Sequence, residues 1–527
     1  MIEHQVVVAV VAAVVLYIVA QRFALRKTLP LPPGPPGYPL IGNLLDLPTA
    51  GWDWKTFGAW ADRYGPLISA RAFGNTIVVI NSHATALALL ESRGPVYASR
   101  PHLVMPVDLM GWKDAMAFTP YGPRLRAYRR TFHAELGSRE SVETYHPQEE
   151  EHARRFVRKV LESPERLMDH CYHHAGAIVL RVAYGYHADE EHDPIIRAGN
   201  EAMATFNKGS SPTAFLVNTI SILKHVPEWF PGAGFQRQAR LWSSHYRQMV
   251  EPPFEMVKAT LEKGTAEDNF VAKSLMKATT KAEEENIMHA AGSMFGGGGD
   301  TTAIAVHFFF LMMILHSDVQ RRAQAEIDAA VGRKHLPSFE DRERLPYVDA
   351  ICKEILRLHP PVPNGLPHAT LEDDVYEGYF IPKGSTVLTN IWKMCRDPKT
   401  YADAKAFRPE RFLGPAPELD PKQLIFGFGR RICPGRLLAD ASVFITVATC
   451  LAVLDIRPVI QDGKRPVGQD GKRPVGLNGD RPVGQDGERL MPEYKTYGRP
   501  VDRLLPFTCD IVPRSGSSVM LESIFTR

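Results

Sequence analysis

The stretch Phe426-Gly-Phe-Gly-Arg-Arg-Ile-Cys-Pro-Gly-Arg436 determines how the rest of this sequence is interpreted. Its three glycines allow a tight backbone and close approach to something flat. Cys433 stands just before an apolar run, from about 436 to 454, that predicts a helix. A thiol at a helix N-terminus is biased toward the thiolate, and Arg430 and Arg431 add positive charge beside it. A thiolate is a strong donor to haem iron, so Cys433 is a candidate ligand of such a metal centre, and a buried structural cysteine is the alternative.

The overall composition is ordinary for a globular protein and limits the possible classes of protein. Of the 527 residues, 44% are hydrophobic and 23% charged, which excludes a disordered chain. The net charge of only +3 argues against nucleic-acid binding driven by bulk charge. No linker inside residues 30–515 separates two regimes of composition, so we expect one large domain. The other cysteines are widely scattered and form no C-x-x-C pair, which indicates buried structural residues rather than zinc ligands or a disulfide scaffold: Cys171, Cys352, Cys395, Cys450 and Cys509.

The N-terminus is a candidate membrane anchor. Val6–Ala20 is uncharged, but as a helix it would span only about 22 Å, so flanking residues would have to help cross a hydrocarbon core of about 30 Å. A cleaved signal peptide is the alternative, although no basic residue precedes the run. Arg22, Arg26 and Lys27 follow it, which indicates a cytosolic body. We therefore predict a transmembrane anchor at residues 1–28 and a stiff proline-rich spacer at 29–39.

Most of the remaining chain is predicted to be helical. Short β-segments are expected at Leu67–Ile80 and Val375–Leu388, and helices between about 83 and 355, which gives a mainly α fold with small β-sheets. An Arg-Pro-Val unit recurs every eight residues from Arg457 to Arg481 with little apolar surface. We interpret residues 461–488 as an exposed loop insertion within a catalytic domain at 40–515, followed by a tail at 516–527.

At this point the sequence resembles a known family. Phe426, Gly429, Arg431, Cys433 and Gly435 match the F-x-x-G-x-R-x-C-x-G signature of the cytochrome P-450 haem-thiolate monooxygenases. The resemblance implies a triangular helical prism around a buried haem b (iron protoporphyrin IX). It also implies that Cys433 is the axial iron ligand, that Phe426 packs near the sulfur and that Arg431 pairs with a haem propionate.

A second motif lies in the predicted helix from Glu283 to about Leu315. Each of the four glycines in Gly296-Gly-Gly-Gly-Asp-Thr-Thr302 weakens a helix by about 1 kcal/mol relative to alanine, so the stretch could open a groove. Asp300 and Thr301 would place a carboxylate and a hydroxyl beside that groove, although a plain loop with two polar residues fits as well. The string resembles the family's [AG]-G-x-[DE]-T-[TS] pattern, which implies that dioxygen enters the groove and that Asp300 and Thr301 deliver protons.

Further charged residues match family elements. Glu354 and Arg357 lie one helical turn apart, and an exposed pair of this kind contributes little. The resemblance implies instead a buried structural network that Arg411 completes. It also makes His368 and Arg129 propionate partners, whereas Leu125 occupies a position where the family has tryptophan and cannot donate a hydrogen bond.

The expected substrate pocket is apolar. By resemblance it includes side chains that are also plausible core residues: Met110, Phe118, Phe206, Phe295, Val362 and Leu366. Their character predicts a lipophilic substrate in an adaptable pocket. Arg499 and Asp502 depart from the small and apolar residues usual in the C-terminal pocket region. Trp229–Phe235 is a candidate membrane contact.

Together these features predict a membrane-anchored monooxygenase that inserts one oxygen atom from O2 into a lipophilic small molecule by hydroxylation or epoxidation. We expect a role in secondary-metabolite biosynthesis or xenobiotic oxidation, a single-pass location in the endoplasmic reticulum membrane and a cytosolic catalytic domain. No nucleotide or flavin module is visible, so electrons would come from NADPH–cytochrome P-450 reductase. A basic face is expected to dock that partner: Arg126, Arg129, Arg130, Arg430 and Arg436. The alternatives are a peroxide-dependent rearrangement enzyme and a haem-binding sensor without turnover, and Asp300-Thr301 argues against both.

Overall fold

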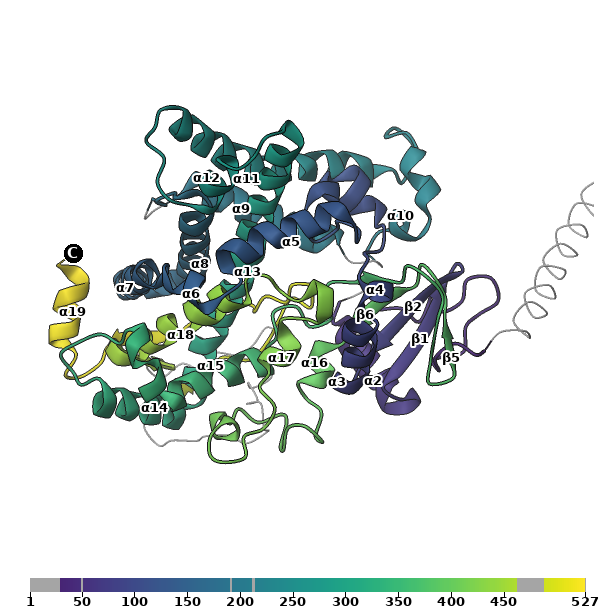
Figure 1. Ribbon diagram of the computed structural model, residues 1–527. Coiled ribbons are helices and arrows are strands. Elements are labelled where there is room, and N and C mark those ends of the chain that lie inside the picture. Colours follow the sequence, from purple (N-terminus) through teal and green to yellow (C-terminus); the bar gives the residue numbers. More distant parts are fainter. Residues whose placement is uncertain (1–28, 49–50, 190–191, 211–213, 462–487, 527) are drawn as a thin grey trace, which may run out of the picture.

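Helices dominate the structure, and a small sheet lies at one end (Figure 1). The computed structural model describes residues 29–48, 51–189, 192–210, 214–461 and 488–526. The longer helices are α2 (Asp53–Tyr64), α5 (Pro123–Leu136), α7 (His146–Glu162), α8 (Leu167–Tyr184), α9 (Pro194–Gly209), α11 (Gly234–Glu262), α13 (Lys281–Leu315), α14 (Ser317–Ala330), α15 (Pro346–Leu358) and α18 (Arg436–Val453). Shorter ones are α3 (His83–Ala86), α4 (Gly94–Tyr97), α6 (Arg139–Glu143), α10 (Leu216–Thr219), α12 (Phe270–Leu275), α16 (Ile391–Met394), α17 (Lys422–Ile425) and α19 (Ser518–Phe525).

The largest sheet joins segments far apart in the sequence. Its order is β1 (Leu67–Ala72), β2 (Asn75–Ile80), β6 (Thr386–Thr389) and β3 (His368–Ala369). Strands β1 and β2 form an antiparallel hairpin, whereas β2 and β6 are parallel. Two-stranded pairs complete the β-structure: β4 (Asp374–Tyr376) with β5 (Tyr379–Ile381), β7 (Leu454–Arg457) with β10 (Asp510–Pro513), and β8 (Val459–Gln461) with β9 (Glu488–Leu490). The predicted mainly helical fold with small sheets is confirmed.

Helix α13 passes through the centre of the helical region (Figure 1). It begins with a capping box between Thr280 and Glu283, and it continues without a break through the four glycines. A Cβ on Gly298 would lie 2.8 Å from Val179 of α8, so glycine allows the two helices to pack closely. The expected opening of the backbone is therefore wrong, because the packing against α8 holds the helix together.

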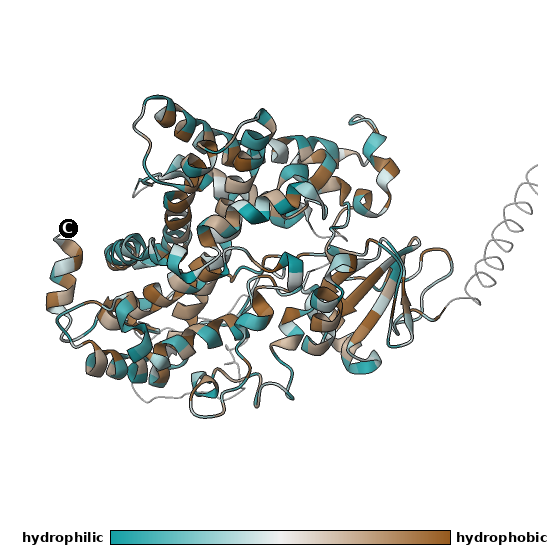
Figure 2. Ribbon diagram, viewed as in Figure 1, coloured by the Kyte–Doolittle hydropathy of each residue, from teal (hydrophilic) through white to brown (hydrophobic). Residues whose placement is uncertain are grey.

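The hydrophobic core surrounds α13 and α18. Both helices are long and apolar enough to cross a membrane, but most of each is buried inside the protein. Figure 2 shows the sheet strands and central helices as largely hydrophobic, while α7 is mostly hydrophilic. The predicted anchor at 1–28 lies outside the described residues. The repeat lies almost entirely outside them as well, between the paired strands β8 and β9.

Candidate functional site

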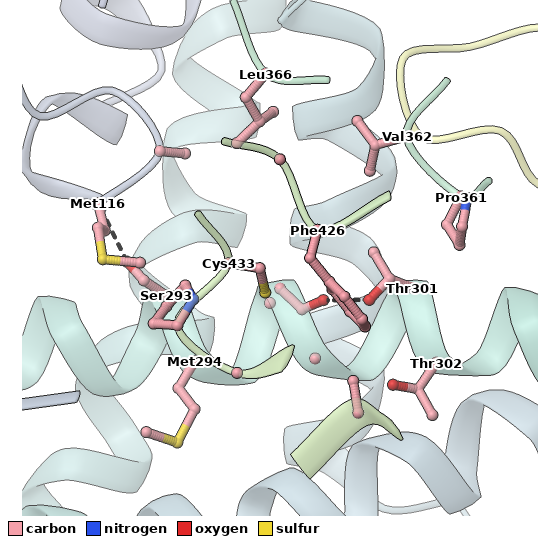
Figure 3. Close-up of a pocket in the computed structure, with 18 of the residues that line it drawn as sticks. Met116, Ser293, Met294, Thr301, Thr302, Pro361, Val362, Leu366, Phe426 and Cys433 are labelled. Atoms are coloured by element: carbon pink, nitrogen blue, oxygen red, sulfur yellow. Dashed lines mark hydrogen bonds between the residues drawn. The ribbon is translucent and has the colours of Figure 1, made fainter. Parts of the chain in front are cut away.

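A cavity of about 330 Å³ lies against α13. Cys433 and Phe426 reach it from the cysteine loop, Thr301 from α13, and Val362 and Leu366 from the segment after α15. Figure 3 shows these side chains around one space, with the Cys433 sulfur beside the helix that carries Thr301. The wall is mostly apolar, so the cavity suits a group that is flat or lipophilic over most of its surface.

The cysteine loop is fixed by its own backbone. The N–H of Cys433 donates a hydrogen bond of 2.7 Å to the carbonyl oxygen of Phe426. Gly429 has φ +54°, and a Cβ there would lie 2.0 Å from the carbonyl oxygen of Leu90. Only glycine therefore fits at this turn. Gly435 caps α18, so the thiol lies at the N-terminus of that helix as predicted.

The electrostatics of the thiol differ from the expectation. Burial raises the pKa of Cys433, while the N–H of Gly435 and the charges of Arg129 and Arg436 lower it in part. The helix terminus and the arginines thus favour the thiolate but do not outweigh desolvation. A cation bound at the sulfur would supply the remaining stabilisation, because metal ligation deprotonates a thiol.

Three partly buried arginines line the same cavity: Arg100, Arg129 and Arg431. Within the described residues none of them forms an ion pair; they donate to backbone carbonyl oxygens instead. Burial lowers the pKa of all three, and that of Arg431 falls to about 10. Buried charges are ordinarily paired, so this side of the cavity is built for an anion.

His368 adds a weaker polar contact to that side. Its Nδ1 donates to the carbonyl oxygen of Tyr97 at 2.9 Å, and burial together with the charge of Arg100 lowers its pKa to about 3. A neutral imidazole that donates from Nδ1 leaves Nε2 as an acceptor, so His368 would need a proton to bind a carboxylate. Leu125 also lines the cavity and offers only apolar contact.

Two glycines leave room at the face of the cavity. A Cβ on Gly297 of α13 or on Gly435 of the cysteine loop would meet no atom within 4 Å, and both residues line the cavity. A flat group could therefore approach the backbone from both sides. With the thiol and the three unpaired arginines, these residues fit a planar macrocycle that carries a metal ion and acidic side groups.

Thr301 and Asp300 are placed differently. Thr301 lines the cavity, and its Oγ1 donates to the carbonyl oxygen of Gly297 at 2.8 Å. Asp300 is buried without lining the cavity and forms an ion pair of 2.8 Å with Arg503. Burial raises the pKa of Asp300, while Arg503 and the Tyr172 hydroxyl lower it in part. Only Thr301 of this pair is therefore in direct reach of a ligand.

The structure brings Glu354, Arg357 and Arg411 together in a fully buried network. Arg357 donates two hydrogen bonds of 2.7 Å to the Glu354 carboxylate, and Arg411 Nε donates a third at 3.1 Å. The remaining donors of Arg357 reach the carbonyl oxygens of Cys395, Ala404 and Ala406. Every charge in this network has a partner, so it holds α15 to the chain that leads to the cysteine loop.

The predicted pocket residues divide into three groups. Phe206, Val362 and Leu366 line the cavity, and Phe118 lines a smaller neighbouring one. Met110 and Phe295 line neither and are core residues. Phe295 contacts Gly199 of α9, because the cavity face of α13 follows Ser293, Met294, Gly297 and Thr301. The expected roles of Met110 and Phe295 in the pocket are therefore wrong.

Other residues enter the site without a local signal. Arg100 is positioned by the bridge between Ser99 and Ala369 of β3, and no motif marks it in the sequence. Val501 also lines the cavity. Asp502, which looked foreign in this region, accepts a hydrogen bond from the N–H of Gly498 and braces the turn there. No motif in the sequence indicates this role of Asp502.

Comparisons with known proteins agree with this geometry. The cytochrome P-450 family model matches residues 32–471. Cytochrome P-450 monooxygenase 208 of Postia placenta is 41% identical over 86% of this chain and 90% of its own. The monooxygenase ppsD of Aspergillus oryzae is 42% identical over 82% and 84%, and claR of Ampulloclitocybe clavipes is 37% identical over 96% and 90%. The chain belongs to the cytochrome P-450 family.

Membership defines the cofactor and the class of enzyme. Cytochromes P-450 bind haem b through a cysteine thiolate, and the relatives are monooxygenases, which are oxidoreductases. A thiol, a glycine cradle and unpaired arginines are the groups that such a cofactor needs. The sequence-based recognition of the family is thus confirmed.

Proposed function

We propose that this protein hydroxylates or epoxidises a lipophilic small molecule, with Cys433 as the axial ligand of haem b. The observation that carries this proposal is the common cavity of Cys433, Thr301 and the unpaired arginines. When bound, a thiolate-ligated haem supplies the activation of O2. The proposed role is in secondary-metabolite biosynthesis or xenobiotic oxidation, and the similarity to fungal monooxygenases supports the reaction class.

Other residues of the chain have separate roles in binding the cofactor, orienting the substrate and supplying protons. Arg100, Arg129 and Arg431 would neutralise the two propionates, and the glycine cradle would hold the macrocycle beside α13. Apolar side chains such as Val362 and Leu366 exclude water and orient the substrate. The Thr301 hydroxyl holds a proton at the cavity face of α13. Asp300 would pass on a proton only after the ion pair with Arg503 opens and the carboxylate takes up a proton.

A spectrum of the reduced protein under carbon monoxide tests the ligand. Wild type is expected to show the red-shifted band typical of thiolate-ligated haem. Cys433→Ala should lose that band, while Cys450→Ala, a buried cysteine remote from the cavity, should keep it. A wild-type band at the position of histidine-ligated or other non-thiolate haem would contradict the assignment of Cys433.

Thr301→Ala tests the proton-relay role. Loss of the hydroxyl should lower the fraction of reducing equivalents that reaches product by roughly tenfold or more, because general acid catalysis contributes a factor of 10² to 10⁴. The neighbouring Thr302→Ala serves as the control. Unchanged coupling in Thr301→Ala would remove the hydroxyl from the mechanism.

NADPH–cytochrome P-450 reductase is the proposed electron donor. Arg126, Arg130 and Arg430 are exposed, and Arg126 and Arg430 both lie over the ring of Tyr121. Arg129 lines the cavity, so it belongs to the cofactor site rather than to a docking face. Arg126→Glu should raise the reductase concentration needed for half-maximal turnover, and the effect should diminish at high salt.

The protein is proposed to lie on the endoplasmic reticulum membrane with its catalytic domain in the cytosol. Large apolar side chains are exposed around α10 and the start of α11: Leu216, Ile222, Trp229, Phe230 and Leu241. Trp229 is 80% exposed, which suits insertion into a lipid surface. In a chain lacking residues 1–28, Trp229→Ala should lower binding to phosphatidylcholine vesicles; unchanged binding would contradict this contact.

A further inference from the structure

A smaller cavity of about 60 Å³ adjoins the larger one. The two share Arg100, Ala117, Phe206, Gly365 and Leu366 as walls, so they lie on either side of the same side chains. Further walls come from the start of α2, the end of α9 and residues 498–500. The remaining lining residues are Pro101, Leu103, Phe118, Ala214, Asn364, Pro367 and Leu388. Neither the haem ligand nor the proton relay uses this space.

Two neutral polar atoms face this region without a partner. Ser210 Oγ and Asn364 Oδ1 are both buried, and neither has a hydrogen-bond partner among the residues that the structure describes. Ser210 follows α9 directly and is only 7% exposed. The backbone carbonyl of Asn364 accepts the N–H of Thr389 at 3.2 Å, which holds the residue in place and leaves its side-chain amide oxygen available. Buried polar atoms are nearly always satisfied, so both call for a hydrogen-bonding partner.

The size and charge of the cavity restrict that partner. One water molecule takes about 30 Å³ in the liquid, so the space holds an end group and not a whole substrate. One carboxylate and two guanidinium groups line it: Asp53, Arg100 and Arg499. A charged end group would therefore face a charge of its own sign, whereas a neutral hydroxyl or N–H group would not.

We propose that Ser210 and Asn364 recognise a hydroxyl or N–H group at the end of the substrate remote from the oxidised carbon. This inference rests on the proposed monooxygenase function and names its substrate class: elongated lipophilic molecules with a neutral hydrogen-bond donor at one end. The body of the substrate lies in the larger cavity, and its end group passes between Phe206 and Leu366.

The test uses the full-length, haem-loaded protein and two probes of equal length. Dodecanol donates a hydrogen bond, and methyl undecyl ether, with the same number of non-hydrogen atoms, does not. Binding is followed by the shift of the oxidised haem band and, independently, by calorimetry. Dodecanol should bind about tenfold more tightly than the ether, as expected for one hydrogen bond to a buried group. Ser210→Ala and Asn364→Leu should each reduce this ratio severalfold while changing ether affinity less than twofold.

Ser221→Ala is the matched control, since Ser221 is exposed and lines neither cavity. Equal affinities in wild type, no binding of dodecanol, or a ratio that survives both substitutions would overturn the inference. A missing thiolate signature under carbon monoxide would instead overturn the proposed function. The calorimetric ratio does not depend on the haem spectrum, so the two failures are distinguishable.

Discussion

Two clusters of arginines, one fully buried and one partly buried, differ in how their charge is balanced. Arg357 and Arg411 share the carboxylate of Glu354, and Arg411 also pairs with Glu418. Arg100, Arg129 and Arg431 line the cavity, and none of them has a carboxylate partner within the described residues. Both clusters flank the cysteine loop, yet only the first is complete in the protein alone.

This difference in charge balance separates the structural role of one cluster from the cofactor-binding role of the other. An unpaired buried charge is costly, and a paired one holds its neighbours in place. The first cluster therefore stabilises the fold without a ligand. The second cluster holds positive charge without a carboxylate partner at the site where an acidic cofactor binds. The fold therefore positions part of the charge that favours haem binding before haem is present.

The largest expected effect on stability comes from breaking the first cluster, formed by Glu354, Arg357 and Arg411. Glu354→Gln would leave Arg357 and Arg411 buried beside a neutral side chain, and the loss of one partner from a buried ion pair costs about 3–5 kcal/mol. We expect the free energy of unfolding in urea to fall by that amount. A change below about 1 kcal/mol would show that the network is not structural.

The second cluster, formed by Arg100, Arg129 and Arg431, should respond differently to the loss of one member. Arg431→Leu removes a partly buried charge that has no carboxylate partner but donates to two backbone carbonyl oxygens, so stability in the absence of haem should fall by less than in Glu354→Gln. Retention of haem should weaken by roughly tenfold, because a charge-assisted hydrogen bond to a propionate is lost. The rate of haem transfer to an excess of apomyoglobin measures this. Equal transfer rates in variant and wild type would place Arg431 outside the cofactor site.

The sequence predicted one cluster and only part of the other. Glu354 and Arg357 are one turn apart, and Cys433, Gly429 and Arg431 belong to one short loop, so local spacing carries both patterns. Arg100 reaches the cavity through pairing between Ser99 and Ala369, which a linear pattern does not contain.

The same reasoning explains the errors on α13. A helix places neighbouring residues about 100° apart, so Met294 faces the cavity while Phe295 packs against α9. The partner of Asp300 is Arg503, which comes from the distant C-terminal region. Motif matching identified the right helix, but the direction of each side chain depends on tertiary packing.

A third buried ionisable group extends the comparison because it has a hydroxyl partner and no charged one within the described residues. Glu149 lies in the core, accepts a hydrogen bond from the Ser442 hydroxyl and leaves its second carboxylate oxygen unpaired. Burial raises its pKa to about 8 from 4.5. The native protein thus binds a proton that the unfolded chain has lost, so this contribution to stability is complete below about pH 4.5 and is lost as the pH rises through about 8.

Glu149→Gln should remove this dependence. Between pH 6 and 8 the wild-type free energy of unfolding should fall by roughly 1 kcal/mol per pH unit relative to the variant. Urea unfolding at a series of pH values gives the two curves. Parallel curves would mean that Glu149 titrates normally and that its burial is relieved by solvent.

The smallest effect is expected one residue away from Arg411. Glu410 accepts from Arg322 at 2.7 Å, but the two side chains are 39% and 57% exposed. Glu410→Gln is the same chemical change as Glu354→Gln and retains an acceptor for the Tyr347 hydroxyl. Because solvent screens an exposed pair, the free energy of unfolding should fall by less than about 0.5 kcal/mol, and by less still in 1 M salt. A loss comparable to that of Glu354→Gln would mean that pairing alone, and not burial, sets the importance of these carboxylates.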